Sequence, residues 1–325
     1  MRLNWKPAHM AALFAAAAAL QAAHAQTWPS KPIRAVLAAA PGVPSDTLAR
    51  GLMEPLTKSL GQPVVVENRV GADGIIGTEA CAKAPPDGHT LCVTASNVMI
   101  WNPVLRAKLP YDPVKDFAPV VHAGFFDSAL IAHPSVKANT VQQLLQLARS
   151  KPDSVNWAHF GVNSTGYMYQ EYLKKRFKAP FYPVPYKTQP QVLTALVSGE
   201  GHVAVYGLAN AGPLLKSGKL KALAVTSAQR ADFLPRIPTF AEEGIKLPLR
   251  TWFGYHYPAA TPRAYVLRMN VEIRTAMADP AFKEKVLNRI GLIPNPGTPE
   301  DFDAYIKTQL KEVRELVSYL GIKPD

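Results

Sequence analysis

Short apolar runs alternate with amphipathic stretches along most of this chain. Continuous apolar runs occur at 33–40 (IRAVLAAA), 63–68 (PVVVEN) and 89–95 (HTLCVTA). After the first of them, a leucine stands at every fourth position from Leu48 to Leu60, which predicts a helix that ends at Gly61. A further helix is expected over 75–84. Because the apolar runs are continuous rather than alternating, they predict a parallel sheet with helices on both faces.

The same alternation continues through the middle of the chain. Strands are expected at 127–133, 154–159, 181–186, 202–208 and 221–227, with helices at 140–150, 166–177 and 190–198. The last third is mostly helical. Three dipeptides there, Thr261-Pro262, Asp279-Pro280 and Thr298-Pro299, each place an N-cap residue before a proline at the first helical position.

The first 25 residues follow a different pattern. Arg2 and Lys6 precede the apolar run AALFAAAAAL, and the stretch ends in Ala23-His24-Ala25. These features predict a secretory signal peptide that is cleaved after Ala25, and hence a periplasmic protein. A buried N-terminal helix is the alternative, but the run lacks a polar face. No later apolar run approaches the roughly 20 residues that cross a membrane.

Charge and cysteine content narrow the function classes. The formal net charge is +12, yet the basic residues are dispersed, with no run longer than Lys174-Lys175-Arg176. This pattern favours attraction for anionic solutes over binding of nucleic acid. Cys81 and Cys92 are the two cysteines. They could form one disulfide between a helix and the following strand, or remain two buried thiols.

Motifs of enzymes are absent from the sequence. It contains no GxSxG, HExxH or Walker motif, and GADGIIG at 71–77 lacks the dinucleotide fingerprint. No histidine pair has metal-ligand spacing, so we expect no metal and no cofactor. A hydrolase with a triad assembled from distant residues remains an alternative.

Two strand-to-helix turns are candidate anion sites. AAAPGVPSD at 38–46 has Ser45 or Asp46 at the expected helix cap, and AHFGVNSTGYMYQE at 158–171 has Ser164 and Thr165 there. Free N–H groups and the positive end of the helix dipole attract anions at such turns. If the turns belong to two different domains, they could face each other across a cleft.

Motifs along the whole chain carry a family resemblance. PGVPSDTLAR, GQPVVVENRVGADGIIGTEA, LPYDPVKDFAPV, SGKLKALAVTS and TWFG occur in the order and spacing of a known family. The chain resembles the solute-binding proteins of tripartite tricarboxylate transporters, also called the Bug family. The resemblance implies a non-enzymatic receptor of the type II-like periplasmic binding fold, with two α/β lobes that close on one carboxylate. It also implies delivery of the solute to membrane permease subunits by a monomer.

On this resemblance, lobe 1 comprises 26–123 plus 250–325, and lobe 2 comprises 124–249. The crossing segments would lie near 120–125 and 249–255. The resemblance also implies that backbone amides and hydroxyls hold the carboxylate. The candidate ligand-binding residues are Val43, Pro44, Ser45, Asp46, Ser96, Asn97, Trp157, Phe160, Gly161, Asn163, Ser164, Thr165, His202 and Tyr206.

Departures from the family pattern bear on the solute. Ala39 replaces an aromatic residue and Val43-Pro44 replace two glycines, whereas Trp157, Phe160 and Tyr206 add aromatic side chains. These changes favour an aromatic mono- or dicarboxylate such as a phthalate isomer, for example terephthalate. An aliphatic di- or tricarboxylate remains open if the aromatic residues belong to the core. A ligand-sensing subunit for a sensor kinase is a further alternative.

Overall fold

The computed structural model describes residues 28–162, 164–232, 234–246 and 250–324. The predicted signal peptide and its cleavage site lie outside this part of the chain. Among the described residues, no helix combines the length and apolar character needed to cross a membrane.

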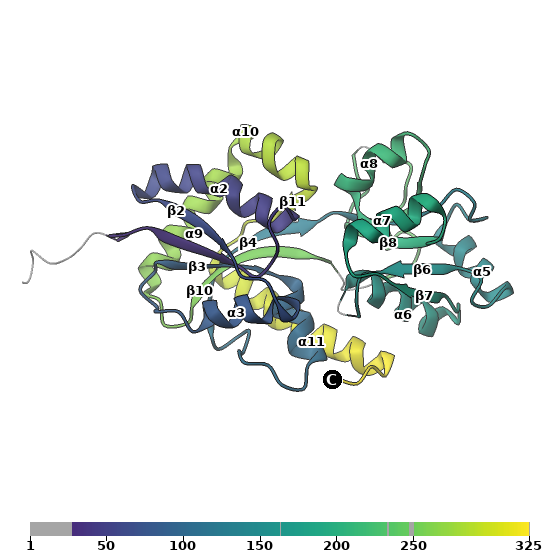
Figure 1. The fold of residues 1–325 in the computed structure, drawn as a ribbon, viewed down its shortest axis with the longest axis horizontal. Coiled ribbons are helices and arrows are strands. Elements are labelled where there is room, and N and C mark those ends of the chain that lie inside the picture. Colours follow the sequence, from purple (N-terminus) through teal and green to yellow (C-terminus); the bar gives the residue numbers. More distant parts are fainter. Residues whose placement is uncertain (1–27, 163, 233, 247–249, 325) are drawn as a thin grey trace, which may run out of the picture.

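Two β-sheets organise the molecule, and helices cover each of them (Figure 1). The six-stranded sheet has the order β11-β4-β10-β3-β1-β2, and the five-stranded sheet has the order β7-β6-β8-β5-β9. We call the parts of the chain built on them the first unit and the second unit. Both confirm the α/β class.

The first unit is assembled from two separate stretches of sequence. Its elements are β1 (Ile33–Leu37), α2 (Pro44–Leu60), β2 (Val64–Asn68), η1 (Ala72–Gly74), α3 (Ile75–Ala82), β3 (Thr90–Ala95), η2 (Asn97–Trp101), α4 (Asn102–Leu105), β4 (Phe117–Phe126), β10 (Trp252–Pro258), α9 (Arg263–Ala278), α10 (Pro280–Phe282), η3 (Lys283–Asn288), β11 (Leu292–Pro294) and α11 (Pro299–Leu320). The predicted leucine face of α2 is buried, and Gly61 ends this helix at φ 70°, a conformation that favours glycine.

The second unit comes from the stretch between β4 and β10. Its elements are β5 (Ser128–Ala132), α5 (Val141–Ser150), β6 (Asn156–His159), α6 (Thr165–Phe177), β7 (Tyr182–Pro185), α7 (Gln189–Ser198), β8 (Val203–Gly207), α8 (Leu208–Lys216) and β9 (Lys221–Val225). Strands β5, β8 and β9 are almost wholly buried, as their continuous apolar runs predict.

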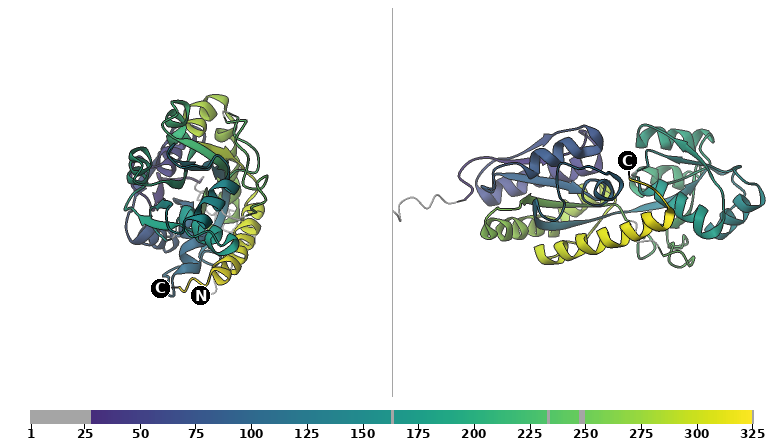
Figure 2. Two further views of the ribbon diagram at one scale, coloured as in Figure 1. Left: turned by 90° about the vertical axis from the view of Figure 1, so that its right-hand side faces the viewer. Right: turned by 90° about the horizontal axis from the view of Figure 1, so that it is seen from below.

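The two units meet at two adjacent connections. The first connection is Asp127, between β4 and β5, and the second is 250–251, which leads into β10. The N–H of Phe126 donates to the carbonyl of Thr251 at 2.8 Å, so the connections lie side by side. Helix α11 runs along the first unit and reaches the second unit, where Tyr319 packs near Tyr172 of α6 (Figure 2).

Two expectations about these elements are wrong. The sheets are mixed rather than parallel. In the six-stranded sheet β10 returns from the second unit and enters antiparallel between β3 and β4, and in the five-stranded sheet β5 pairs antiparallel with β8 and β9. Helix α9 begins at Arg263, not at Pro262, since Pro262 has an extended ψ of 132° and occupies the N-cap. The expected starts at Asp279-Pro280 and Thr298-Pro299 are confirmed, with Asp279 and Thr298 as side-chain caps.

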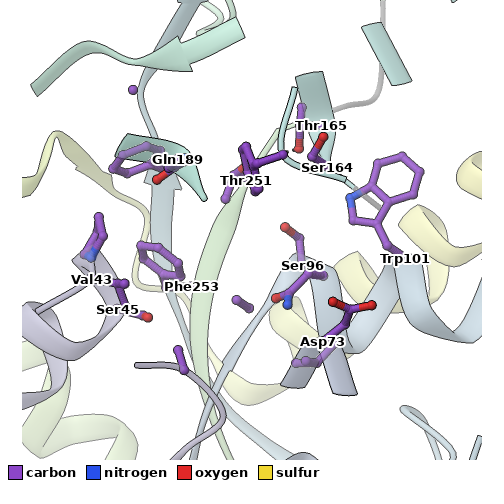
Figure 3. Close-up of a pocket in the computed structure, with 18 of the residues that line it drawn as sticks. Val43, Ser45, Asp73, Ser96, Trp101, Ser164, Thr165, Gln189, Thr251 and Phe253 are labelled. Carbon is purple, nitrogen blue, oxygen red and sulfur yellow. Dashed lines mark hydrogen bonds between the residues drawn. The ribbon is translucent and has the colours of Figure 1, made fainter. Parts of the chain in front are cut away.

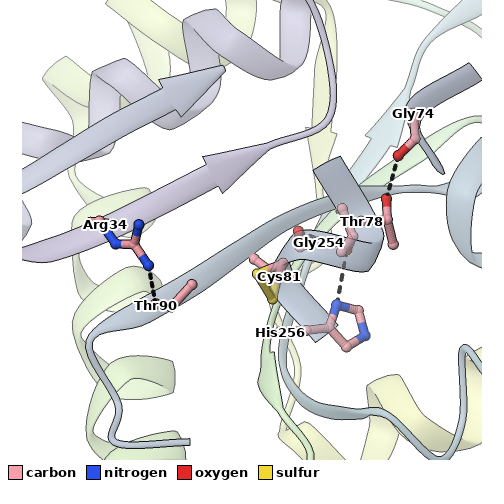
Figure 4. Close-up of a disulfide and its surroundings, with 9 residues drawn as sticks. Arg34, Gly74, Thr78, Cys81, Thr90, Gly254 and His256 are labelled. Carbon is pink, nitrogen blue, oxygen red and sulfur yellow. Dashed lines mark hydrogen bonds between the residues drawn. A yellow bond between two sulfur atoms is a disulfide. The ribbon is translucent and has the colours of Figure 1, made fainter. Parts of the chain in front are cut away.

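The open question about the cysteines is settled by a disulfide between Cys81 at the end of α3 and Cys92 in β3 (Figure 4). Their Cα atoms are 5.8 Å apart. Both residues are buried in the hydrophobic cluster that also contains Val36 and Val98. The bridge ties the helix that follows β2 to the centre of the six-stranded sheet.

We expect the double variant Cys81→Ser/Cys92→Ser to lose about 2–3 kcal/mol of unfolding free energy. The two residues are 11 apart in sequence, and closing a loop of this size removes roughly that much chain entropy from the unfolded state. Urea unfolding of both proteins measures the difference. Equal midpoints for the wild type and the double variant would contradict the prediction.

Candidate ligand-binding site

A cavity of about 400 Å³ lies between the two units (Figure 3). The first unit contributes the ends of β1 and β3 and the start of α2, and the second unit contributes the start of α6. Residues flanking both connections complete the walls. The lining residues are Leu37, Ala38, Ala39, Val43, Pro44, Ser45, Asp73, Val93, Ala95, Ser96, Asn97, Val98, Trp101, Phe126, Ser128, Phe160, Ser164, Thr165, Gly166, Lys187, Gln189, Val205, Gly207, Thr251 and Phe253.

The turn before α2 reaches this cavity with Val43, Pro44 and Ser45. The expectation that Ser45 or Asp46 caps the helix is wrong, because the helix begins at Pro44 and Val43 is the N-cap. Proline fits the first helical position, where an N–H group would have no partner. The Ser45 hydroxyl makes no hydrogen bond to the described residues and faces the cavity (Figure 3).

Asp46, which was expected at the ligand, is not among the lining residues and instead holds the turn in place. Its carboxylate accepts hydrogen bonds from Gly42 N and Arg50 Nε, both at 2.9 Å, and from Asn68 Nδ2, also at 2.9 Å. Burial alone would raise the pKa of Asp46, but the bonds from Arg50, Gly42 and Asn68 outweigh it and lower the pKa. Asp46 is therefore ionised and fixes the loop that carries Val43.

The second turn approaches from the opposite wall. Ser164 is the N-cap of α6, as expected, and its Oγ accepts from Tyr167 N and donates to Gly161 O. Thr165 Oγ1 lies 3.1 Å from Thr251 Oγ1 of the second connection. The N–H groups of Thr165 and Gly166 have no carbonyl partner inside the helix, since they belong to its first turn. They form the positive end of α6 at the cavity wall.

The third wall follows β3, where Ser96 and Asn97 line the cavity. Asp73 stands beside them, held at φ 54° by a hydrogen bond from Asn102 Nδ2 to its carbonyl. Its carboxylate pairs with Arg106 at 2.7 Å. This ion pair reduces the negative potential that Asp73 would otherwise add to the cavity.

Charge and hydrogen-bonding capacity favour an anion. Asp73 and Lys187 are the charged residues among the described lining residues, and the described residues provide no ion-pair partner for Lys187. Hydroxyl groups come from both units and from the residues beside the connections: Ser45, Ser96, Ser128, Ser164, Thr165 and Thr251. The described ranges contain no group of three or more His, Cys, Asp or Glu that could hold a metal ion.

Aromatic rings form a large share of the apolar lining, beside aliphatic residues such as Leu37 and Val93. Phe160 was expected there, whereas Trp101, Phe126 and Phe253 were not. The rings of Phe126 and Phe253 are 6.1 Å apart. Both phenylalanines flank the connections. The TWFG motif at 251–254, which supports the family resemblance, therefore also supplies Thr251 and Phe253 to the site.

Two of the expected aromatic residues lie in the core instead of the lining. Trp157 is fully buried, packs against Phe181 and donates from Nε1 to Gly166 O at 3.0 Å. Tyr206 is 3% exposed and packs in the core of the second unit, while its strand neighbours Val205 and Gly207 line the cavity. Alternation along β8 explains this difference.

His202 and Gly161, which were also expected at the site, lie outside the lining. His202 precedes β8, at the end opposite Gly207, and its Nδ1 accepts from Asn156 N at 2.9 Å. Burial, together with His133, lowers the pKa of His202. Gly161 contributes its carbonyl to the Ser164 cap. Asn163 is outside the described residues.

Comparison with known proteins identifies the family. The model described as the tripartite tricarboxylate transporter family receptor, TctC, matches residues 48–322. The chain belongs to this receptor family. The resemblance found in the sequence motifs is thereby confirmed.

Two curated relatives of this receptor cover almost the whole chain. A UPF0065 protein of Bordetella bronchiseptica is 32% identical over 308 residues, which is 95% of this chain and 91% of the relative. Protein BugT of Bordetella pertussis is 30% identical over 301 residues, or 92% of each chain.

Solved structures agree with the fold of the receptor. R. palustris Rpa4515 with adipate has a TM-score of 0.81 at 29% identity, covering 92% of this chain and 100% of that one. MatC from Rhodopseudomonas palustris with bound malate has a TM-score of 0.75 at 29% identity, covering 89% and 100%. The periplasmic binding protein BugD gives a TM-score of 0.77, also at 29% identity, with coverage of 91% and 99%.

Proposed function

We propose that this receptor binds a small carboxylate in the 400 Å³ cavity between its two units. The observation that carries the proposal is the convergence of hydroxyl groups and the N-terminal end of α6 on that cavity from both sides. The solved relatives hold adipate and malate, both carboxylates. Hydrogen bonds to a charged group contribute about 1.5–3 kcal/mol each.

The two units act as lobes that close on the solute. We assign the lobes as the family resemblance implies, lobe 1 to 26–123 plus 250–325 and lobe 2 to 124–249, except that 124–126 complete β4 and so belong to lobe 1. The connections at Asp127 and 250–251 then form the hinge. A solute that contacts both lobes stabilises the closed form by its differential affinity. Membrane permease subunits then accept the solute from the closed receptor, which residues 1–25 direct to the periplasm.

An aromatic mono- or dicarboxylate, such as the phthalate isomer terephthalate, fits this lining. The rings of Phe126, Phe160 and Phe253 supply apolar surface, and burying about 100 Å² of a ligand ring is worth roughly 2–3 kcal/mol. Two carboxylate anchors add about 3–6 kcal/mol before ordering costs. Micromolar affinity needs about 8 kcal/mol. Lys187 and the positive end of α6 are suited to one carboxylate each.

A thermal-shift screen of refolded, ligand-free protein tests the solute class. We expect terephthalate and benzoate at 1,000 times their Kd to add about 4.1 kcal/mol of stability and to raise Tm by several degrees. Adipate and malate are the aliphatic controls. A shift with the aliphatic acids alone would retain the carboxylate receptor and refute the aromatic solute. No shift with any of the four would refute the carboxylate assignment.

Site variants locate the binding in the same experiment. Ser164→Ala should weaken terephthalate binding about 10-fold, because it loosens the α6 cap that positions the N–H groups of Thr165 and Gly166. Ser217→Ala is the control, since Ser217 lies at the end of α8, outside the cavity lining. Equal terephthalate affinities of Ser164→Ala and Ser217→Ala would contradict the assignment of the binding site to this cavity.

A further inference from the structure

A second cavity lies at the junction of the units and shares no lining residue with the first. Its volume is about 850 Å³. Helix α6 and residues 226–228, 240–241 and 245–246 line it from the second unit, and α11 lines it from the first unit. Arg250, in the second connection, also lines it.

Arg250 has no hydrogen-bond partner or ion-pair partner among the described residues, and its Nε is buried. The guanidinium carbon lies 3.7 Å from the centre of the Phe125 ring, which covers one face of the group. Burial lowers the pKa of Arg250 although Tyr305, Asp127 and Tyr169 act in the opposite direction. Arg250 as a whole is half-buried, so its guanidinium loses part of its hydration without gaining a hydrogen-bonded counter-charge, and a bound anion would compensate for that loss.

The remainder of the lining combines apolar walls with a charged rim. The rings of Tyr169 and Phe240 lie 4.7 Å apart, and Ile245 and Leu316 add aliphatic surface. At the rim, Lys246 and Arg176 are exposed and have no ion-pair partner among the described residues. Glu312 and Glu315 of α11 also line the cavity. An anionic head is therefore favoured near Arg250, and an apolar body along the walls.

We propose that this cavity is a second binding site, which takes an amphipathic monocarboxylate with its carboxylate on Arg250 and its apolar body against Phe240 and Leu316. The guanidinium fork suits a carboxylate, which it can bind with two parallel hydrogen bonds. Binding at this site is separate from the solute cavity and does not depend on the proposed function; its effect on closure of the units rests on that function.

The site is placed to affect closure of the units. Its walls come from both units, and Arg250 is followed by Thr251, whose hydroxyl contacts that of Thr165 in the lining of the first cavity. A ligand that binds one arrangement of the units better than the other shifts the equilibrium between them. The coupling with the first cavity is then reciprocal.

Titration calorimetry with octanoate tests the second site, with 1-octanol as the uncharged matched probe. We expect octanoate to bind the wild type and to bind Arg250→Met at least 10-fold more weakly. Ala241→Trp, at an exposed lining residue, should block the cavity while it leaves Arg250 intact. Ser164→Ala, in the first cavity, should change octanoate affinity less than twofold.

Three results would overturn the second site. The first is equal affinity of the wild type for octanoate and octanol. The second is undiminished octanoate affinity in both Arg250→Met and Ala241→Trp. The third is a loss of octanoate affinity in Ser164→Ala as large as that in Arg250→Met. Circular dichroism checks that each variant is folded. If Arg250→Met does not fold, the octanoate affinity of Ala241→Trp alone tests the site, and an unchanged affinity refutes it. Terephthalate affinity of the same variants separates failure of this site from failure of the solute cavity.

Discussion

Replacing Gly77 by alanine should lower the unfolding free energy by about 3 kcal/mol and reduce Tm by roughly 5–10 °C. Gly77 lies in α3 where this helix crosses the end of β1. A Cβ atom there would be 2.5 Å from the Arg69 carbonyl oxygen and 2.8 Å from the Ala38 Cα. Both contacts are with backbone, so no side-chain rotation relieves them. Because Ala38 lines the solute cavity, carboxylate affinity should fall as well.

Gly166→Ala is the matched control for this result. Gly166 is also helical, near the start of α6, but a Cβ there would meet the Val205 carbonyl oxygen at 3.5 Å, an ordinary contact. Alanine is a better helix former than glycine by up to about 1 kcal/mol. Stability should therefore stay equal or rise in Gly166→Ala. Equal urea midpoints for Gly77→Ala and the wild type would show that β1 and α3 can separate without cost.

Local pattern predicted most of the first unit, and long-range pairing explains what it missed. The β1-α2-β2-α3-β3 order follows from apolar runs and from the end of α2 at Gly61, which act over a few residues. The partners of β4 are β10 and β11, more than 120 residues away along the chain. No periodicity within one segment encodes that pairing. A parallel sheet was therefore expected where the sheets are mixed.

The same distinction applies to the candidate site. Ser164 could be identified from the sequence, because capping depends on neighbours three residues away. Phe126 and Thr251 line the cavity because two connections lie side by side, which composition does not reveal. Trp157 and Tyr206 were expected in the cavity, yet they lie on buried strand positions. The chain pattern indicates that a strand is buried, but not which of its two faces meets the cavity.

Acid should destabilise this receptor well above the pH at which carboxylates titrate. His122 and His256 are 3% and 0% exposed, and burial lowers the pKa of each from 6.5 to about 3. Arg250 contributes to this lowering at His122, and His122 contributes to it at His256. His256 Nδ1 lies 2.9 Å from Thr94 Oγ1, whose proton goes to Gly254 O, while His256 Nε2 has no partner among the described residues. A proton added at Nε2 would be buried without an acceptor.

The sign and size of the effect follow from proton binding. Between pH 6.5 and about 3, the unfolded chain binds protons at these histidines and the folded protein does not, so stability falls as pH falls. Each histidine contributes at most about 1.36 kcal/mol per pH unit. From pH 6.5 to about 4.5 the two together remove up to roughly 5 kcal/mol, which is comparable with the total stability of many domains. Asp46 and Asp112 have lowered pKa values, so protonation of these carboxylates reduces the free energy of unfolding only at more acidic pH.

Urea unfolding at pH 7.0, 5.5 and 4.5 measures this slope. The double variant His122→Gln/His256→Gln keeps polar side chains at both positions and removes both titrations. It should be less stable than the wild type at pH 7, since the packing against Phe302 and Tyr305 is altered. Its loss between pH 7.0 and 4.5 should nevertheless be much smaller, and the two curves should approach each other in acid. Parallel curves would mean that the protonated imidazoles are accommodated at the junction of β4 and β10, and that acid acts on this receptor elsewhere.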